Sequence, residues 1–335
     1  MERSRLMSSA ANTTKKVVIG VALLVVSGMG PCIVFVLLGL PNLANAAILP
    51  GVALTIACVT GTGWRGGMIV VGPFAVFCAL AAWASPSPWL AAIVLAAGAF
   101  LRAYAARAGL HDALILTVIT LGFLVATPYQ FDSVVPTPIL VGVVSLGAGL
   151  WATIVIFALR KWIPHVTRVH IERIRVLAYS VLLAVLVGVA TWLVVYFKLG
   201  QTGGWIILTI LVVFQPYFGA GFKKGRARAL GTVAGLCITV VIGFFFSTGV
   251  ILYVIGSIFA IIMFLFLLQN RPYWMYAMVL TPTVVLLDSA NSNVGVVAIE
   301  RLKGTLIGIA FTLVVMLALL PIAKRLEVKP TTPSQ

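Results

Sequence analysis

Long apolar stretches alternate along the chain with short stretches that contain Lys, Arg, Pro and Gly. Because a helix needs about 20 mostly apolar residues to cross a bilayer, this pattern predicts an all-helical membrane protein with about 12 transmembrane helices. Two spans, 46–60 and 203–217, are short enough to be broken or re-entrant. The predicted spans are 17–40, 46–60, 67–84, 88–104, 112–127, 138–159, 175–197, 203–217, 229–247, 249–268, 272–288 and 294–322.

The composition supports this interpretation. Of the 335 residues, 62% are hydrophobic and 9% are charged, whereas a soluble domain is nearer half apolar and a quarter charged. A soluble enzyme, a disordered protein and a nucleic-acid-binding domain are therefore excluded. No nucleotide-hydrolysis or metalloprotease motif occurs, so we expect no enzyme activity, cofactor or metal.

The distribution of Lys and Arg predicts the orientation. With the N-terminus inside, nearly all of the 23 basic residues fall in inner segments, and the outer loops contain only Lys198. The positive-inside rule accounts for this asymmetry and for the net charge of +16. Both termini are therefore expected in the cytoplasm.

Similar short sequences at two places in the chain predict an internal repeat. The sequence ALILT at 113–117 resembles AMVLT at 277–281, and VGVV occurs at both 141–144 and 294–297. The simplest account is two parallel six-helix halves. The predicted division is a cytoplasmic N-terminal tail at 1–16, halves at 17–160 and 175–323, a cytoplasmic linker at 161–174, and a cytoplasmic tail at 324–335.

A second repeated motif has the form R-x-x-G-T-x-x-G, and its two copies begin at Arg228 and at Arg301. Three predicted spans separate the two copies, so they run in opposite directions, which is the mark of an inverted 3+3 repeat. The glycines form G-x-x-x-G steps that allow helices to approach closely. The threonines of the motif, Thr232 and Thr305, can hydrogen-bond across such a contact.

Arg301 is the leading candidate for binding a substrate carboxylate. It lies within an apolar span, where a charge is costly and usually functional. Alternatively, the long last helix protrudes, and Arg301 reaches the outer interface. Arg228 stands at the predicted cytoplasmic edge beside Lys223, Lys224 and Arg226, so we expect its loss to matter less.

Two acidic residues are candidates for carrying a proton. Glu300 is three residues from Lys303 and can pair with it, which would leave Arg301 as the unneutralised cation. Asp288 ends a predicted span and is the second candidate, although the sequence favours an ordinary loop charge for it.

The Gln215-Pro216 pair interrupts the eighth span, and such breaks often line substrate cavities. Tyr217, Phe218, Lys223 and Lys224 follow it, and together they suit an aromatic carboxylate. Tyr273 and Trp274 form a similar cluster, for which an interfacial aromatic belt is the alternative. 

These motifs carry a family resemblance over about residues 200–325. Gln215-Pro216, Phe218-Gly219 and the two R-x-x-G-T motifs make the second half resemble the fusaric acid resistance and aromatic acid exporter family. The first half resembles it more weakly because it lacks both motifs. The resemblance implies a bacterial inner-membrane exporter of aromatic carboxylic acids, driven by the proton gradient.

Other functions stay open at this point. The chain is distantly similar to plant aluminium-activated malate channels, which leaves a passive organic-anion channel as the alternative, and a lipid- or polyprenyl-handling protein as a third. The expected partners are small organic anions and the lipid bilayer. A homodimer and a periplasmic adaptor subunit are further candidates, and no nucleic acid is expected.

Overall fold

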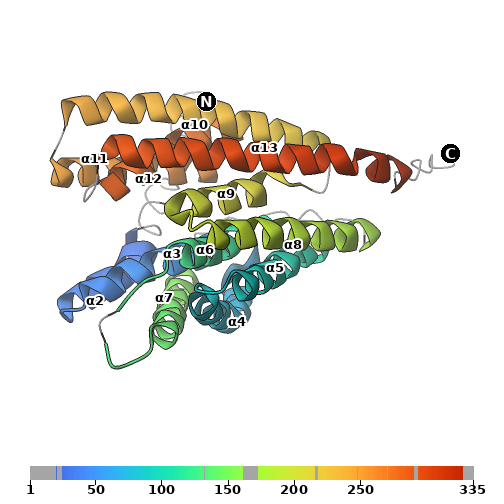
Figure 1. Cartoon of the computed structure of the whole chain (residues 1–335). Coiled ribbons are helices and arrows are strands. Elements are labelled where there is room, and N and C mark those ends of the chain that lie inside the picture. The colour runs from blue at the N-terminus through green and yellow to red at the C-terminus, as the bar shows by residue number, and fades with distance from the viewer. Residues whose placement is uncertain are drawn as a thin grey trace, which may run out of the picture.

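The computed structural model describes residue 20 and residues 25–131, 133–160, 173–215, 218–246, 248–269, 271–289 and 293–326. All regular structure in this part of the chain is helical (Figure 1), as predicted. Short π-helices lie at Val25–Met29 and Cys58–Thr62, and a 3-10 helix lies at Ala105–Ala108. The α-helices are α2 (Gly30–Leu37), α3 (Pro41–Ala57), α4 (Gly63–Ala84), α5 (Pro88–Tyr104), α6 (Ile115–Ala126), α7 (Thr137–Ala158), α8 (Arg173–Tyr196), α9 (Gly200–Val213), α10 (Phe218–Phe245), α11 (Gly249–Leu268), α12 (Tyr273–Asp288) and α13 (Val294–Leu326).

Each predicted span overlaps one of the helices α2 to α13, but not every helix is long enough to cross a membrane. In the shorter group, α6, α9 and α12 have 12, 14 and 16 residues. At 1.5 Å per residue α9 is about 21 Å long, against a hydrocarbon core of about 30 Å. Long and apolar enough to cross are the stretches Asn42–Ala84, Pro88–Ala108, Thr137–Ala158, Val176–Tyr196, Ala220–Phe245, Gly249–Phe266 and Val294–Ala318.

The structure differs at the two short spans that were predicted to be broken or re-entrant, 46–60 and 203–217. Around 46–60 the chain is helical, because α3 continues into the π-helix, and the break comes after it at Gly63, which has a φ of 64°. Around 203–217 the predicted interruption is confirmed: α9 ends at Val213, and Phe214 has an extended backbone with ψ of 109°.

Several predicted boundaries fall outside the described residues. These include the N-terminal tail at 1–16, residues 161–172 of the linker, and the end of the C-terminal tail from 327. α8 begins at Arg173, and α13 continues to Leu326. The division into two parallel six-helix halves stays a prediction.

α9 lies between two groups of helices. One group contains α10 to α13 and the other contains α2 to α8, and α9 contacts members of both (Figure 1). Every residue of α9 from Gly203 to Val213 is buried. A helix that is apolar all round belongs in the interior of a protein, and this one forms part of the largest hydrophobic core.

The two R-x-x-G-T helices, α10 and α13, contact each other and run in opposite directions (Figure 1). Gly231 faces α12, where an added methyl group would collide with the backbone at Trp274. Gly304 faces α9, where it would lie 2.7 Å from the carbonyl oxygen of Thr202. Both glycines therefore permit the close helix approach that the motif predicted.

The second glycine of each motif packs in a matching way. A methyl group on Gly235 would lie 2.7 Å from the Cβ of Thr281 in α12, and one on Gly308 would lie 2.7 Å from the Cβ of Thr209 in α9. α10 thus packs on α12 as α13 packs on α9. This correspondence is local, and the inverted 3+3 repeat of whole halves stays a prediction.

Candidate functional site

The two motif arginines are buried completely. Arg228 on α10 is 1% exposed and Arg301 on α13 is 0% exposed. Because its side chain does not reach the surface of the protein, Arg301 is not an interfacial anchor. Arg228 likewise does not share the exposure of its neighbours Lys223 and Arg226. The sequence predicted Arg228 at the cytoplasmic edge, and the structure buries its side chain inside the bundle, ten residues after the start of α10 at Phe218.

Arg228 has partners on two other helices. Its Nε donates to the Thr209 hydroxyl of α9 at 3.1 Å, and its Nη1 donates to the Tyr273 hydroxyl of α12 at 2.9 Å. Its Nη2 is buried and has no hydrogen-bond partner among the described residues.

Arg301 is held differently. The centre of its guanidinium lies 3.9 Å from the ring centroid of Trp205, in a cation–π contact. None of its three nitrogens has a hydrogen-bond partner in the part of the chain that the structure describes. A buried charge without hydrogen bonds is costly, and the cation–π contact offsets only part of that cost, about 2 kcal/mol.

The two guanidinium groups belong to one site. Trp205 and Thr209, which they contact, are one turn apart on α9, and the two charges are close enough to repel each other. Thr232 and Thr305 follow the arginines by four residues on their helices, so they share a helix face with them. Both threonines are buried, and their hydroxyls lack partners among the described side chains and backbone. We call Arg228, Arg301 and these hydroxyls the paired-arginine site.

Comparison with known proteins bears on this region. Residues 189–315 match the model of a family described as fusaric acid resistance protein-like. The second half carries a fusaric acid resistance-like domain. This match confirms the resemblance that its motifs predicted. Comparisons with curated proteins and with solved structures gave no significant match. Together with the apolar helices, the domain points to a multi-pass membrane transporter.

The fusaric acid resistance-like domain contains every element of the paired-arginine site, which sequence reasoning predicted only in part. Of the predicted aromatic pair, Tyr273 contacts Arg228, whereas Trp274 is 43% exposed and lies outside it. Tyr217 lies outside the described residues, as does the side chain of Phe218. Sequence reasoning missed Trp205 and Thr209, because only tertiary packing brings them to the arginines.

Neither predicted acidic residue is hydrogen-bonded to a nitrogen of Arg301. Glu300 is partly exposed, and among the described residues no ion pair joins it to Lys303. Asp288 ends α12, is exposed, and accepts a hydrogen bond of 2.6 Å from the amide of Gln201 near the start of α9. Its charge is close enough to interact with Arg301.

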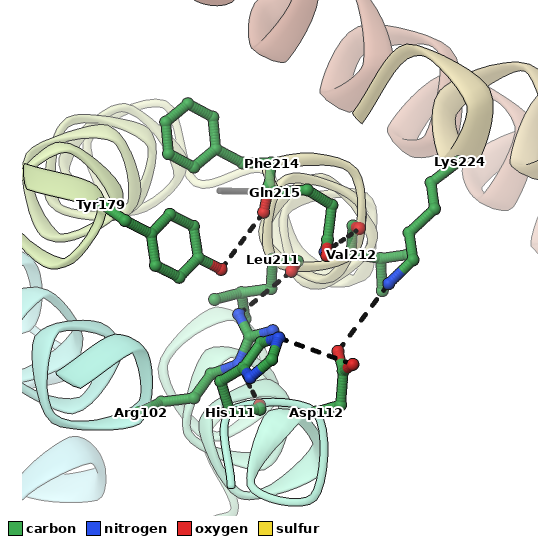
Figure 2. Close-up of polar contacts among 9 residues, drawn as sticks. All are labelled: Arg102, His111, Asp112, Tyr179, Leu211, Val212, Phe214, Gln215 and Lys224. Atoms are coloured by element: carbon green, nitrogen blue, oxygen red, sulfur yellow. Dashed lines mark hydrogen bonds and ion pairs between the residues drawn. The ribbon is translucent and has the colours of Figure 1, made fainter. Parts of the chain in front are cut away.

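A second polar cluster surrounds the other end of α9 (Figure 2). Arg102 of α5 is 1% exposed; its Nε donates to the His111 carbonyl at 2.9 Å and its Nη1 to the Leu211 carbonyl at 3.1 Å. Tyr179 of α8 donates to the Phe214 carbonyl at 3.3 Å. Predicted site residue Gln215 donates to the Val212 carbonyl at 3.0 Å. These donors satisfy carbonyls that the end of a helix leaves without partners.

An acidic residue completes this cluster. Asp112 approaches the Nε2 of His111 at 3.5 Å and the Nζ of Lys224 at 3.7 Å (Figure 2). Lys224, a predicted substrate-binding residue, belongs to the fusaric acid resistance-like domain, whereas Asp112 precedes it in the chain. We call Arg102, His111, Asp112 and Lys224 the Asp112 cluster.

The loop residues of the cluster have shifted pKa values. Burial lowers the pKa of His111 below its usual value, and the charges of Arg102 and Lys224 add to this, while Asp112 opposes it. For Asp112, partial loss of solvent raises the pKa, but the neighbouring cations, Lys224 first and then Arg102, outweigh this effect and hold it below its usual value. At neutral pH, therefore, Asp112 is ionised and His111 is neutral.

One sequence feature pointed to this cluster, which is the presence of Arg102 inside the predicted span at 88–104. No arrangement of His, Cys, Asp and Glu side chains within the described residues could hold a metal ion. The polar groups of both sites are instead mostly cationic donors, which suit an anion.

Proposed function

We propose that this protein exports organic anions across a bacterial inner membrane, with aromatic carboxylic acids as its first substrates and the proton gradient as its energy source. The paired-arginine site holds the carboxylate. The family match and the apolar helices support a membrane transporter, and the chemistry of the site supports the class of substrate.

One observation carries the proposal: Arg301 is fully buried, and none of its nitrogens has a partner among the described residues. Retaining such a charge inside a membrane protein costs stability, so it is expected where a ligand uses it. A guanidinium presents a planar fork that binds a carboxylate through two hydrogen bonds. The free Nη2 of Arg228 offers a further donor nearby.

Aromatic surfaces next to the arginines support a substrate that contains a ring. Trp205 lies against Arg301, and the rings of Tyr273 and Tyr276 stack with centroids 6.0 Å apart. Ring stacking stabilises such pairs by about 0.5–1.5 kcal/mol beyond the area they bury. An aromatic acid can therefore bind through its carboxylate and its ring together.

Polar links at both ends of α9 support alternating access. Gln201 and Asp288 join α9 to α12 at one end, and the Asp112 cluster joins α9, α5 and α10 at the other. Asp288 also interacts electrostatically with Arg301, so a proton on Asp288 would strengthen the attraction of Arg301 for the substrate.

The test measures uptake of labelled salicylate into inverted membrane vesicles with and without a pH gradient. We expect Arg301→Ala to abolish uptake while the protein remains folded and inserted. Arg301→Lys is expected to weaken salicylate binding by about 1–3 kcal/mol, because lysine lacks the planar fork. Arg228→Ala is now also expected to impair uptake severely, since Arg228 lies in the same buried site.

Lys303→Ala is the matched control. Lys303 is on the same helix, two residues from Arg301, but is exposed, so its loss should leave uptake unchanged. Normal uptake by Arg301→Ala would contradict the proposal. Salicylate currents that follow voltage alone, with no effect of the pH gradient, would instead favour the passive channel.

A further inference from the structure

The Asp112 cluster has an excess of positive charge. Arg102 and Lys224 are cations, His111 is neutral at neutral pH, and Asp112 supplies one negative charge. Tyr179, the other titratable group facing the cluster, comes from α8 and is bonded to the Phe214 carbonyl. Two positive charges against one negative charge leave the cluster able to attract a further anion.

Unused hydrogen-bond capacity is present in the same cluster. Arg102 is 1% exposed and His111 is 9% exposed. The Nη2 of Arg102 is buried and has no partner among the residues that the structure describes, so it is an unused donor. Buried polar atoms are normally hydrogen-bonded, so unpaired ones indicate that a further group binds there.

Asp112 is only loosely held. Its carboxylate oxygens lie 3.5 Å from His111 and 3.7 Å from Lys224, and its side chain is 63% exposed. Charged hydrogen bonds are usually about 2.7–2.9 Å long. A carboxylate held at these longer distances in contact with solvent contributes little binding energy, and another carboxylate can replace it.

We propose that Arg102, His111 and Lys224 form a second anion site, which Asp112 occupies as a tethered carboxylate, and that a transported organic anion enters the protein by displacing Asp112. This inference rests on the proposed function. The ligand class is a carboxylate, because the group to be displaced is itself one.

The geometry of α10 connects the two sites. Lys224 precedes Arg228 by four residues and Arg228 precedes Thr232 by four, so all three lie along one face of the helix. Each step advances about 6 Å along the axis. An anion that leaves Lys224 therefore reaches Arg228 after moving about one helical turn.

Substitutions in the cluster test the displacement. In inverted vesicles, Asp112→Asn removes the competing carboxylate and should lower the KM for salicylate about threefold or more without changing the maximal rate. Lys224→Gln should raise the KM. Arg226→Gln is the matched control: it removes the same charge from an exposed position two residues away on α10, and it should transport like the unmodified protein.

Other outcomes would overturn the inference. If Asp112→Asn raises the KM as Lys224→Gln does, the two residues form a structural ion pair. If Asp112→Asn leaves the KM unchanged, Asp112 does not compete with the substrate. A lower maximal rate in Asp112→Asn, with the KM unchanged, would make Asp112 part of the transport step and would equally refute a competing role.

A second measurement separates this inference from the proposed function. Salicylate should raise the melting temperature of purified Asp112→Asn more than that of the unmodified protein, and should raise that of Lys224→Gln less. If the melting temperatures follow this order although no vesicle takes up salicylate, the second anion site stands and the proposed function fails. If the three proteins respond equally, the second anion site is refuted.

The state of His111 gives a pH signature. Protonation adds a positive charge to the site, so the KM for salicylate should fall as the pH drops below the usual pKa of histidine, about 6.5. His111→Gln should remove this dependence, because Asp112 stays ionised over that range. A pH dependence that persists in His111→Gln would exclude His111 as its source.

Discussion

Arg102 and Arg301 are equally buried but differ in how their charges are satisfied. Arg102 donates to two backbone carbonyls, those of His111 and Leu211. Arg301 lies on the ring of Trp205 and donates to no atom among the described residues. The same side chain thus serves two different purposes in one molecule.

The comparison shows that burial of a charge does not by itself identify a binding site. Arg102 lies at the end of α9, where the helix leaves carbonyls unpaired and its dipole favours a cation, so most of its donors are used within the fold. Arg301 donates to no such carbonyl among the described residues. Arg228 resembles Arg102 in having two bonded nitrogens and a free Nη2, but its partners are side-chain hydroxyls and not backbone carbonyls. Unused donors, and not depth, distinguish the residues available to a ligand.

The largest expected effect comes from exchanging each arginine for methionine. Arg102→Met removes two charged hydrogen bonds, each contributing about 1.5–3 kcal/mol, so we expect it to lower the free energy of unfolding by about 3 kcal/mol or more. Arg301→Met removes a buried charge without hydrogen bonds, and it should leave stability unchanged or raise it.

Thermal melting of both purified variants in detergent measures this difference. Equal losses of melting temperature would show that Arg301 is a structural residue like Arg102. If Arg301→Met raises the melting temperature and also abolishes transport, Arg301 differs clearly from Arg102. Its charge would then lower stability and be required for transport.

An intermediate effect is expected at the glycines that position the arginines. In Gly304→Ala the added methyl group would lie 2.5 Å from the Cβ of Trp205, and in Gly231→Ala it would collide with the backbone of α12. Each substitution should cost about 1–3 kcal/mol of stability and reduce salicylate uptake by shifting an arginine.

Gly147→Ala on α7 provides the control. An added methyl group there meets nothing within 4 Å, so stability should stay constant or rise, since alanine favours helix by about 1 kcal/mol. If Gly304→Ala behaves like Gly147→Ala in melting and uptake, close packing does not position Arg301.

The smallest effect concerns the partner of Arg228. Tyr273→Phe removes one hydroxyl that accepts from Arg228 at 2.9 Å, a contact that contributes about 1 kcal/mol. We expect the KM for salicylate to change by a few-fold at most. Tyr253→Phe on α11, where the side chain is 42% exposed, should change nothing. A complete loss of uptake in Tyr273→Phe would show that the hydroxyl itself binds the anion.

Much of the fold was predictable, because the bilayer imposes one requirement on every span. Apolar length located each helix from α3 to α13, and the Gln215-Pro216 pair correctly predicted an interruption after α9. Arg301 was recognisable because an arginine within an apolar stretch stands out from its neighbours.

The partners of the arginines were not predictable from the pattern. Arg228 follows a run of cations and therefore resembled an edge residue, yet the helix carries it inward to Thr209. Arg102 donates to the carbonyl of Leu211, 109 residues later in the chain. Neither the local spacing nor the hydrophobicity of a segment specifies which distant helix end will meet it.

The length of α13 makes this protein sensitive to the thickness of its membrane. Its apolar stretch Val294–Ala318 has 25 residues, or about 37 Å, against a hydrocarbon core of about 30 Å. A helix longer than the core tilts, protrudes or thickens the bilayer around it. Because α13 packs on α9 and α10, we expect bilayers of different thickness to strain these contacts, so the acyl-chain length of the lipids becomes a variable that acts on the packing around Arg301.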